Sequence, residues 1–190
     1  MPDATQRLFH EYLAASARAG SRIALDQLAQ QFQPRLLAHA RRLTGSADAA
    51  QDVVQESWLE IVRGLPRLDD SAAFPAWAFR IVSRRCAKWI RRMQRQRQLD
   101  AQLAAEALDP PQQNEGEQTA DAQRVRQAIA ALPHDQRAAI ALFYLEDMTV
   151  AEIAIALNTP AGTVKTRLMH ARDKIRRSLD LKEKVDERAG

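Results

Sequence analysis

The residues whose types and spacing best suit a chemical task lie near the C-terminus, in the segment TVAEIAIALNTPAGTVKTRLMHARDKIRR (149–177). Within it, apolar side chains recur at helical intervals, as on one buried face: Val164, Leu168, Ala171 and Ile175. The opposite face carries mainly polar side chains, with five cations at its rim: Lys165, Thr166, Met169, His170 and Asp173, then Arg167, Arg172, Lys174, Arg176 and Arg177. This surface suits a DNA-recognition helix, because such side chains can reach base edges in the major groove while rim arginines bind phosphates.

The residues before this face predict a helix-turn-helix. Thr149 and Glu152 have the spacing of a capping box, which fixes the start of the first helix. Asn158 tolerates the left-handed turn conformation, and Thr159-Pro160 predicts a cap followed by proline at the first helical position. The alternative is a helical hairpin with an ordinary solvated basic face. The coincidence of capping box, turn, proline and basic excess favours the helix-turn-helix.

Two charged ridges are predicted in the N-terminal half. Residues 46–63 place Asp52, Glu56 and Glu60 opposite an apolar stripe: Ala50, Val54, Trp58 and Ile61. Residues 74–97 place a basic ridge (Arg80, Arg84, Lys88, Arg91 and Arg95) opposite a second apolar stripe: Ala78, Val82, Cys86, Trp89 and Met93. Opposite charges indicate one cationic and one polyanionic partner. For the acidic ridge, an ordinary solvated surface is the alternative.

The inventory of reactive side chains argues against an enzyme. The four histidines are scattered along the chain, and no His-Glu-x-x-His motif or Gly-rich phosphate loop occurs. Cys86 has no histidine close by in the sequence and falls on an apolar stripe, where it is best interpreted as a small buried hydrophobe. We therefore expect no catalytic residue, no metal site and no cofactor.

Composition predicts a cytoplasmic protein. The chain has 190 residues, a net charge of +4 and one cysteine, so an intrachain disulfide is excluded. The N-terminus lacks the basic start and apolar core of a signal peptide, and no apolar run approaches the ~18 residues of a membrane helix. We expect no membrane insertion.

The predicted fold is all-α: two small helical domains joined by a flexible acidic linker, the C-terminal one containing the helix-turn-helix. Helix-forming residues dominate, and material for strands is scarce. Residues 100–122 contain six acids, the pair Pro110-Pro111 and no Lys or Arg, which indicates the linker. The predicted division is an N-terminal extension, a helical domain, the linker, a helix-turn-helix domain and a tail: 1–22, 23–98, 99–121, 122–181 and 182–190.

Three segments, in order, resemble the conserved segments of bacterial extracytoplasmic-function (ECF) RNA polymerase sigma factors: DVVQESWLEIV (52–62), FPAWAFRIVSRRCAKWIRR (74–92) and LPHDQRAAIALFYLEDMTVAEIAIALNTPAGTVKTRLMHAR (132–172). The resemblance covers residues 25–179. It implies a factor that binds core RNA polymerase, directs it to promoter DNA and helps to melt the minus-ten element, with an anti-sigma factor as a further partner. Catalysis would belong to the polymerase.

The resemblance also assigns residues. Core polymerase would bind Asp52, Gln55 and Glu56, whereas the minus-ten element would be held by Leu68, Arg80, Arg84, Lys88 and Arg91. The minus-thirty-five element would be read by Lys165, Thr166, Met169 and His170, with Arg167 and Arg172 on phosphates. The acidic linker would follow the RNA-exit path.

Two features depart from the family pattern. Residues 1–22 exceed its minimal extent, and Arg84 stands where some members have Asn in the pocket that holds a base. The alternative function is a helix-turn-helix repressor or activator that needs no core polymerase. Retardation of a promoter fragment by this protein alone would favour the repressor, and dependence on core polymerase would favour the sigma factor.

Limited proteolysis tests the predicted linker. We expect subtilisin to cut first within residues 100–122 and to release two folded helical fragments, because this stretch has few large apolar side chains. Mass spectrometry would locate the cut and circular dichroism would follow helicity. Resistance in this stretch, or loss of all helicity on cleavage, would contradict the two-domain prediction.

Overall fold

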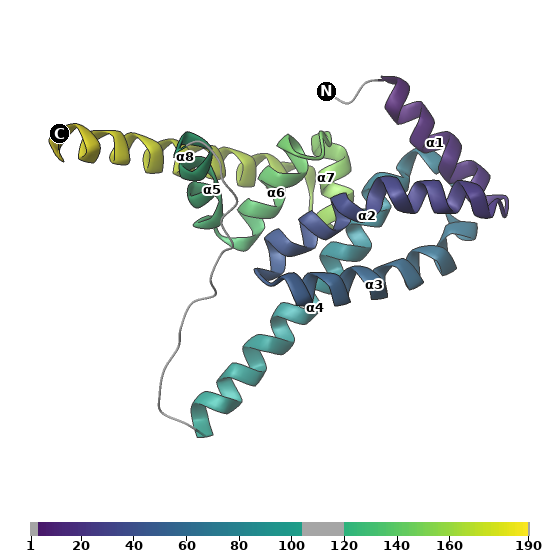
Figure 1. The fold of residues 1–190 in the computed structure, drawn as a ribbon, viewed down its shortest axis with the longest axis horizontal. Helices are drawn as coiled ribbons and strands as arrows, with labels where there is room; N and C mark the ends of the chain where they lie inside the picture. Colours follow the sequence, from purple (N-terminus) through teal and green to yellow (C-terminus); the bar gives the residue numbers. More distant parts are fainter. Residues whose placement is uncertain (1–3, 104–119, 190) are drawn as a thin grey trace.

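The computed structural model describes residues 4–103 and 120–189, and every regular element in those two ranges is a helix (Figure 1). The N-terminal unit contains four α-helices and two short 3-10 turns: α1 (Ala4–Arg18), α2 (Arg22–Thr44), α3 (Ala47–Gly64), η1 (Leu65–Arg67), η2 (Ser71–Ala73) and α4 (Phe74–Leu103). The C-terminal unit contains α5 (Ala120–Ala130), α6 (His134–Tyr144), α7 (Val150–Leu157) and α8 (Ala161–Ala189). The all-α prediction is confirmed.

Helix boundaries follow from local sequence. The hydroxyls of Ser21 and Ser46 each accept a hydrogen bond from a backbone N–H in the first turn of α2 and α3, at 3.3 Å. Gly45 ends α2 in the left-handed region, with φ +71°, where glycine is favoured. The predicted linker lies mostly outside the described residues, although α4 continues to Leu103 and α5 begins at Ala120.

The core of the N-terminal unit is where the two predicted apolar stripes meet α2. The rings of Phe32 and Phe74 make an edge-to-face contact with centroids 5.0 Å apart. Both stripes are buried through most of their length, with Trp58, Trp89 and Met93 half-buried. Burial raises the pKa of the Cys86 thiol to about 12, which suits its prediction as a core residue.

Helix α1 belongs to this core although the predicted division separates it. Leu13 and Ala14 are buried among the core residues, and α1 packs on α2 and η2. At its C-terminal end, the Arg18 guanidinium donates to the carbonyls of Leu68 and Asp69, at 2.8 and 2.9 Å. The helix therefore fastens the loop that leads into α4.

The C-terminal unit contains the predicted helix-turn-helix. Thr149 and Glu152 form the capping box at the start of α7, and Asn158 has φ 49° and ψ 52° in the turn. The prediction that Thr159 caps α8 is wrong. Its hydroxyl donates to the Leu157 carbonyl at 3.1 Å, and α8 begins after Pro160, whose carbonyl accepts from the Val164 N–H at 3.1 Å. Helix α8 continues to Ala189 and so includes most of the predicted tail, 182–190.

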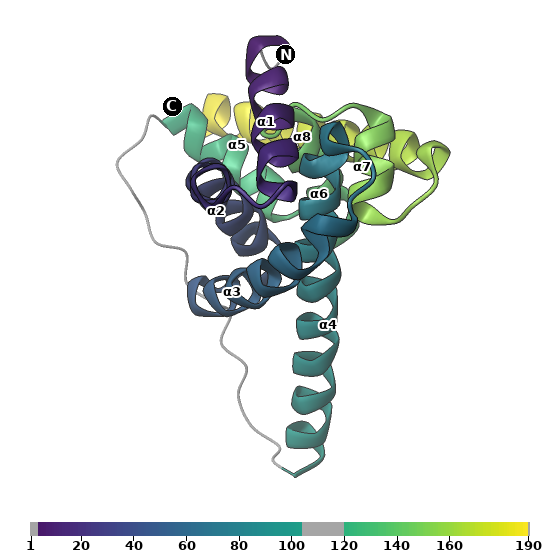
Figure 2. The same cartoon turned by 90° about the vertical axis from the view of Figure 1, so that its right-hand side faces the viewer.

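The two units pack against each other. Helix α7 lies on α4, and α6 lies on α2, so the helix-turn-helix adjoins the N-terminal unit. The C-terminal part of α4 extends away from the other helices in both views (Figures 1 and 2). Its first half is thus shared between the core and the other unit, whereas its second half projects.

Two glycines offer a matched test of the packing. A Cβ at Gly64 would lie 2.8 Å from Cζ2 of Trp77, a rigid ring packed on the core, whereas one at Gly162 would meet nothing within 4 Å. We expect Gly64→Ala to lower the free energy of unfolding by about 1 to 3 kcal/mol through overpacking. Gly162→Ala should change it by less than ~1 kcal/mol, and in the stabilising direction, because alanine favours helix. Urea denaturation measures both, and equal effects would contradict the packing.

Candidate nucleic-acid interface

The predicted recognition face of α8 is open to solvent. The four side chains of this face are all exposed, and none of them belongs to the buried core: Lys165, Thr166, Met169 and His170. The Thr166 hydroxyl donates to the Gly162 carbonyl at 3.1 Å, which fixes its rotamer. Val164, Leu168 and Ala171 on the other face are buried, so the helix cannot rotate without losing its core contacts.

Two of the rim arginines are held by neighbours. Arg167 is largely buried and donates to Asp135 at 2.6 Å and to the Thr159 hydroxyl at 3.3 Å. Arg172 donates to the Tyr144 hydroxyl at 2.9 Å, and its guanidinium also lies over the rings of Phe143 and Tyr144. A phosphate contact by Arg167 would therefore require release of its ion pair with Asp135.

The acidic and basic ridges meet, which the sequence did not predict. Glu60 pairs with Arg84 and Arg85, and Glu56 pairs with Arg85, so part of each ridge neutralises the other. Arg85 was missed because it lies beside the predicted basic ridge. The pairing of Arg85 could have been predicted from two neighbouring helices that carry opposite charges on faces able to meet. Asp52 and Gln55 remain exposed on α3.

The remaining predicted minus-ten residues divide into two groups. Lys88 and Arg91 are exposed and line a shallow groove on the projecting part of α4 together with Arg92 and Arg95. Leu68 is half-buried against the core, with its carbonyl bound by Arg18. Arg80 is exposed, but its guanidinium is already bonded to the other unit.

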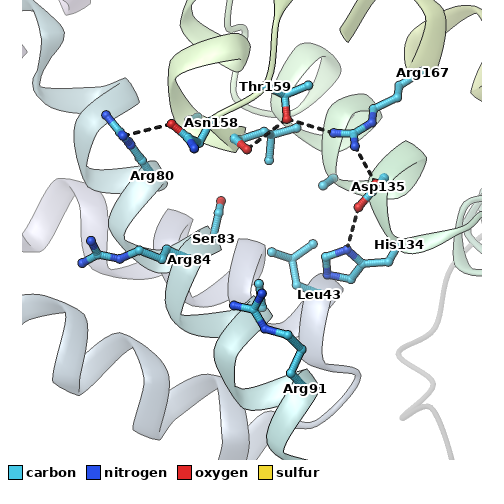
Figure 3. Close-up of a pocket in the computed structure, with 14 residues that line it drawn as sticks. Leu43, Arg80, Ser83, Arg84, Arg91, His134, Asp135, Asn158, Thr159 and Arg167 are labelled. Carbon is cyan, nitrogen blue, oxygen red and sulfur yellow. Dashed lines mark hydrogen bonds and ion pairs between the residues drawn. The ribbon is translucent and has the colours of Figure 1, made fainter. Parts of the chain in front are cut away.

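Arg80 borders a cavity between the two units (Figure 3). The cavity has a volume of about 340 Å³ and brings predicted minus-ten and minus-thirty-five residues together: Arg80, Arg84 and Arg91 from α4, and Arg167 from α8. The Arg80 guanidinium donates to Oδ1 of Asn158 at 2.9 Å. The turn of the helix-turn-helix is thus bonded directly to the basic face of α4.

A buried carboxylate lies at a second contact between the units. The Glu146 side chain is 4% exposed and accepts a hydrogen bond from Arg35 Nε at 2.9 Å, while Arg42 Nη1 lies 3.7 Å away. Burial raises the pKa of the Glu146 carboxyl above its ordinary value, against the opposing attraction of Arg35 and Arg42. Glu146 lies in the short connection between α6 and α7. Nothing local distinguishes it from a solvated turn residue.

Metal-binding side chains do not cluster in the described part of the chain. No three His, Cys, Asp or Glu side chains there gather closely enough to hold a metal ion. His39 is fully buried and bonded to the Ser83 hydroxyl at 2.9 Å, and burial lowers its pKa to about 3. It therefore stays neutral at physiological pH. No helix in the described ranges has the length and hydropathy needed to span a membrane.

Both units match models of known protein families. Residues 28–96 match the model of Sigma-70 region 2, and residues 122–175 match that of Sigma-70 region 4. The solved structures of RpoE from Bartonella quintana with the anti-sigma factor NepR, and of CnrH with the cytosolic domain of CnrY, have TM-scores of 0.67 and 0.66, each at 24% identity. They cover 82% and 91% of this chain, and 96% and 98% of their own chains, and show that the fold is shared.

Curated relatives extend the match over nearly the whole chain. ECF RNA polymerase sigma factor SigM of Mycobacterium tuberculosis is 32% identical over 170 residues, covering 89% of this chain and 83% of its own length. ECF RNA polymerase sigma factor SigW of Bacillus subtilis is 27% identical over 172 residues, covering 85% and 92%. With region 2 and region 4 in order and a curated relative 32% identical over 89% of the chain, the chain belongs to the ECF sigma factors, which direct RNA polymerase to promoters.

Proposed function

We propose that three surfaces of this sigma factor divide the work of initiation. Core polymerase binds α3 at Asp52, Gln55 and Glu56. The minus-ten element is melted and held by Leu68 and the α4 side chains Arg80, Arg84, Lys88 and Arg91. The minus-thirty-five element is read by α8. The observation that carries the proposal is the open recognition face of α8 in a chain whose α3 surface is also free for a protein partner.

The core-binding role rests on the composition of the exposed face of α3. Asp52, Gln55, Glu56 and Leu59 lie at helical spacing on one face, and Leu59 is 58% exposed. An exposed large apolar side chain among carboxylates suits a protein interface better than a merely solvated ridge. Glu56 already forms an ion pair with Arg85, so Asp52 is the carboxylate more available to a partner.

The minus-ten role rests on the projecting half of α4. Lys88 and Arg91 are exposed there without an acidic neighbour on their own helix, which leaves them available to phosphates. Arg80 and Arg84 are engaged by Asn158 and Glu60, so DNA would have to replace these acceptors. Leu68 stands in the loop that Arg18 fastens, close to the start of α4.

The minus-thirty-five role rests on α8. Lys165, Thr166, Met169 and His170 would contact base edges, and Arg172 would reach a phosphate from its support on Tyr144. Arg167 would take its proposed phosphate contact only after leaving Asp135.

The rest of the proposal concerns organisation and setting. It includes a path of the acidic linker through the RNA exit. It also includes the domain boundaries 1–22, 23–98, 99–121, 122–181 and 182–190. We place the protein in the cytoplasm, with no catalytic residue, metal or cofactor of its own. An anti-sigma factor is a further partner, supported by the shared fold with RpoE, which was solved with NepR. The family match argues against a repressor that works without core polymerase.

Reversal of Asp52 tests the core-binding surface. Asp52→Lys should weaken binding to core polymerase about 10-fold or more, because like charges facing each other across an interface cost several kcal/mol. Gel filtration with core polymerase measures binding. Run-off transcription from the DNA upstream of the protein's own gene measures function. Asp26→Lys makes the same charge change at an exposed site on α2 and should leave both intact. Undiminished co-elution of Asp52→Lys with core would remove α3 from this role.

Substitutions on α8 test base reading. Lys165→Ala or His170→Ala should weaken use of the cognate promoter by about 1 to 3 kcal/mol and relax preference at one base position. Lys174→Ala, exposed further along α8, should weaken all promoters alike, because a phosphate contact carries no sequence information. Run-off transcription over single-base promoter variants separates the two patterns. Unchanged preference in both Lys165→Ala and His170→Ala would rule out this helix as the reader.

A further inference from the structure

A second cavity lies where α1 and α2 meet the connection between α6 and α7. Its volume is about 530 Å³, which falls in the range of roughly 300–1,000 Å³ that small-molecule sites occupy. Helix α1 contributes four of the side chains that line it: Gln6, Arg7, His10 and Glu11. The match to Sigma-70 region 2 begins at residue 28, so α1 lies outside it. The cavity therefore depends on a part of the chain that the family match does not account for.

The least exposed of these α1 side chains is a histidine. His10 is 6% exposed, and its ring makes an edge-to-face contact with Phe32 at a centroid distance of 4.9 Å. Its Nε2 atom is buried and has no hydrogen-bond partner among the described residues. Burial, and then the charge of Arg35, lower the pKa of His10, so the ring is neutral at physiological pH. With its proton on Nδ1, the ring offers Nε2 as an acceptor that a ligand with an N–H group can satisfy.

The charges around the cavity favour a cation as that ligand. Four carboxylates line it against two guanidiniums: Glu11, Glu146, Asp147 and Glu152, with Arg7 and Arg35. Arg7 is paired with Glu152 at 3.2 Å. Arg35 is paired with Glu146 at 2.9 Å. An anion would have to displace these carboxylates from their arginines, whereas a cation would meet an excess of negative charge.

The positions of the acids indicate more than one positive group on the ligand. Glu11 belongs to α1, whereas the other three carboxylates belong to residues 146–152 of the C-terminal unit. Apolar surface is added to the lining by Pro75, Leu145 and Met148. Two ammonium groups joined by a methylene chain would match carboxylates from both units and cover this apolar surface. A bare metal ion is less suited, because no three metal-binding side chains cluster in the described ranges.

We propose that the cavity between α1, α2 and residues 145–152 binds a small aliphatic diamine, with one ammonium group donating to Nε2 of His10 and paired with the Glu11 carboxylate. The other ammonium group lies toward the acids of the C-terminal unit. This site is independent of the assignments of the polymerase and DNA surfaces. It gives α1 a ligand-binding role.

Isothermal titration calorimetry of the full chain tests the class of ligand. The probes are linear diamines of three to six carbons, in about 0.15 M salt, where diffuse attraction between exposed charges is screened. We expect saturable binding at one site. The matched diol, which lacks charge, and the matched bis-trimethylammonium compound, which lacks N–H groups, should each bind about 10-fold more weakly or worse than the diamine of equal chain length.

Variants test the two side chains that the proposal names. His10→Phe keeps an aromatic ring against Phe32 but removes Nε2, and should weaken diamine binding about 10-fold or more. His10→Gln carries an amide oxygen near the position of Nε2 and should recover most of the binding. Glu11→Gln, at an exposed site, should weaken binding several-fold, whereas Asp26→Asn, exposed on α2 outside the cavity, should not change it.

Hydrogen exchange locates the bound diamine, which should slow exchange in α1 and in residues 145–152. Circular dichroism accompanies each variant, and if His10→Phe does not fold, Glu11→Gln decides. The proposal is overturned if no diamine binds saturably, since the cavity then holds water alone. It is also overturned if folded His10→Phe and Glu11→Gln bind as tightly as the wild type, or if the diol or the bis-trimethylammonium compound binds as tightly as the diamine.

Discussion

Arginine cannot lose its charge in a folded protein, so every guanidinium brought near the core must meet an acceptor. Helix α4 brings this constraint into the molecule, because it combines a buried apolar face with a face rich in arginine. Arg84 and Arg85 meet carboxylates of α3, and Arg80 meets the turn after α7. The arrangement of α3 beside α4 and of α7 upon α4 satisfies the arginines that the apolar packing brings together.

The same acceptors explain how the proposed DNA-binding surface of α4 can exist before DNA arrives. Asn158 and Glu60 occupy Arg80 and Arg84 with oxygens, as phosphate oxygens would. Exchange of these oxygens for phosphate oxygens would keep the number of arginine hydrogen bonds nearly constant, so its free-energy cost would be small. The exposed pairs contribute little to stability by themselves, because water and salt screen them.

The sequence predicted what depends on neighbours along the chain. The capping box at Thr149, the left-handed Asn158 and the apolar stripes of α3, α4 and α8 are all local or periodic, and each is present. Thr159 was assigned wrongly as the cap of α8, because a threonine before a proline can belong either to a turn or to a helix cap. In the structure its hydroxyl donates to the Leu157 carbonyl and accepts from Arg167, so Thr159 belongs to the turn. Glu146 could not be predicted, because its partner Arg35 lies 111 residues away and no periodic pattern links the two.

Burial of Glu146 has a consequence for how firmly the units hold together. A carboxylate removed from water loses hydration that two arginines only partly replace, and its raised pKa shows that burial outweighs their attraction. An interface centred on such a group is weaker than an apolar interface of equal area. It is nevertheless specific, because in any other packing arrangement Glu146 would be buried without a cation. The contact between the two units at Glu146 is therefore weak but specific.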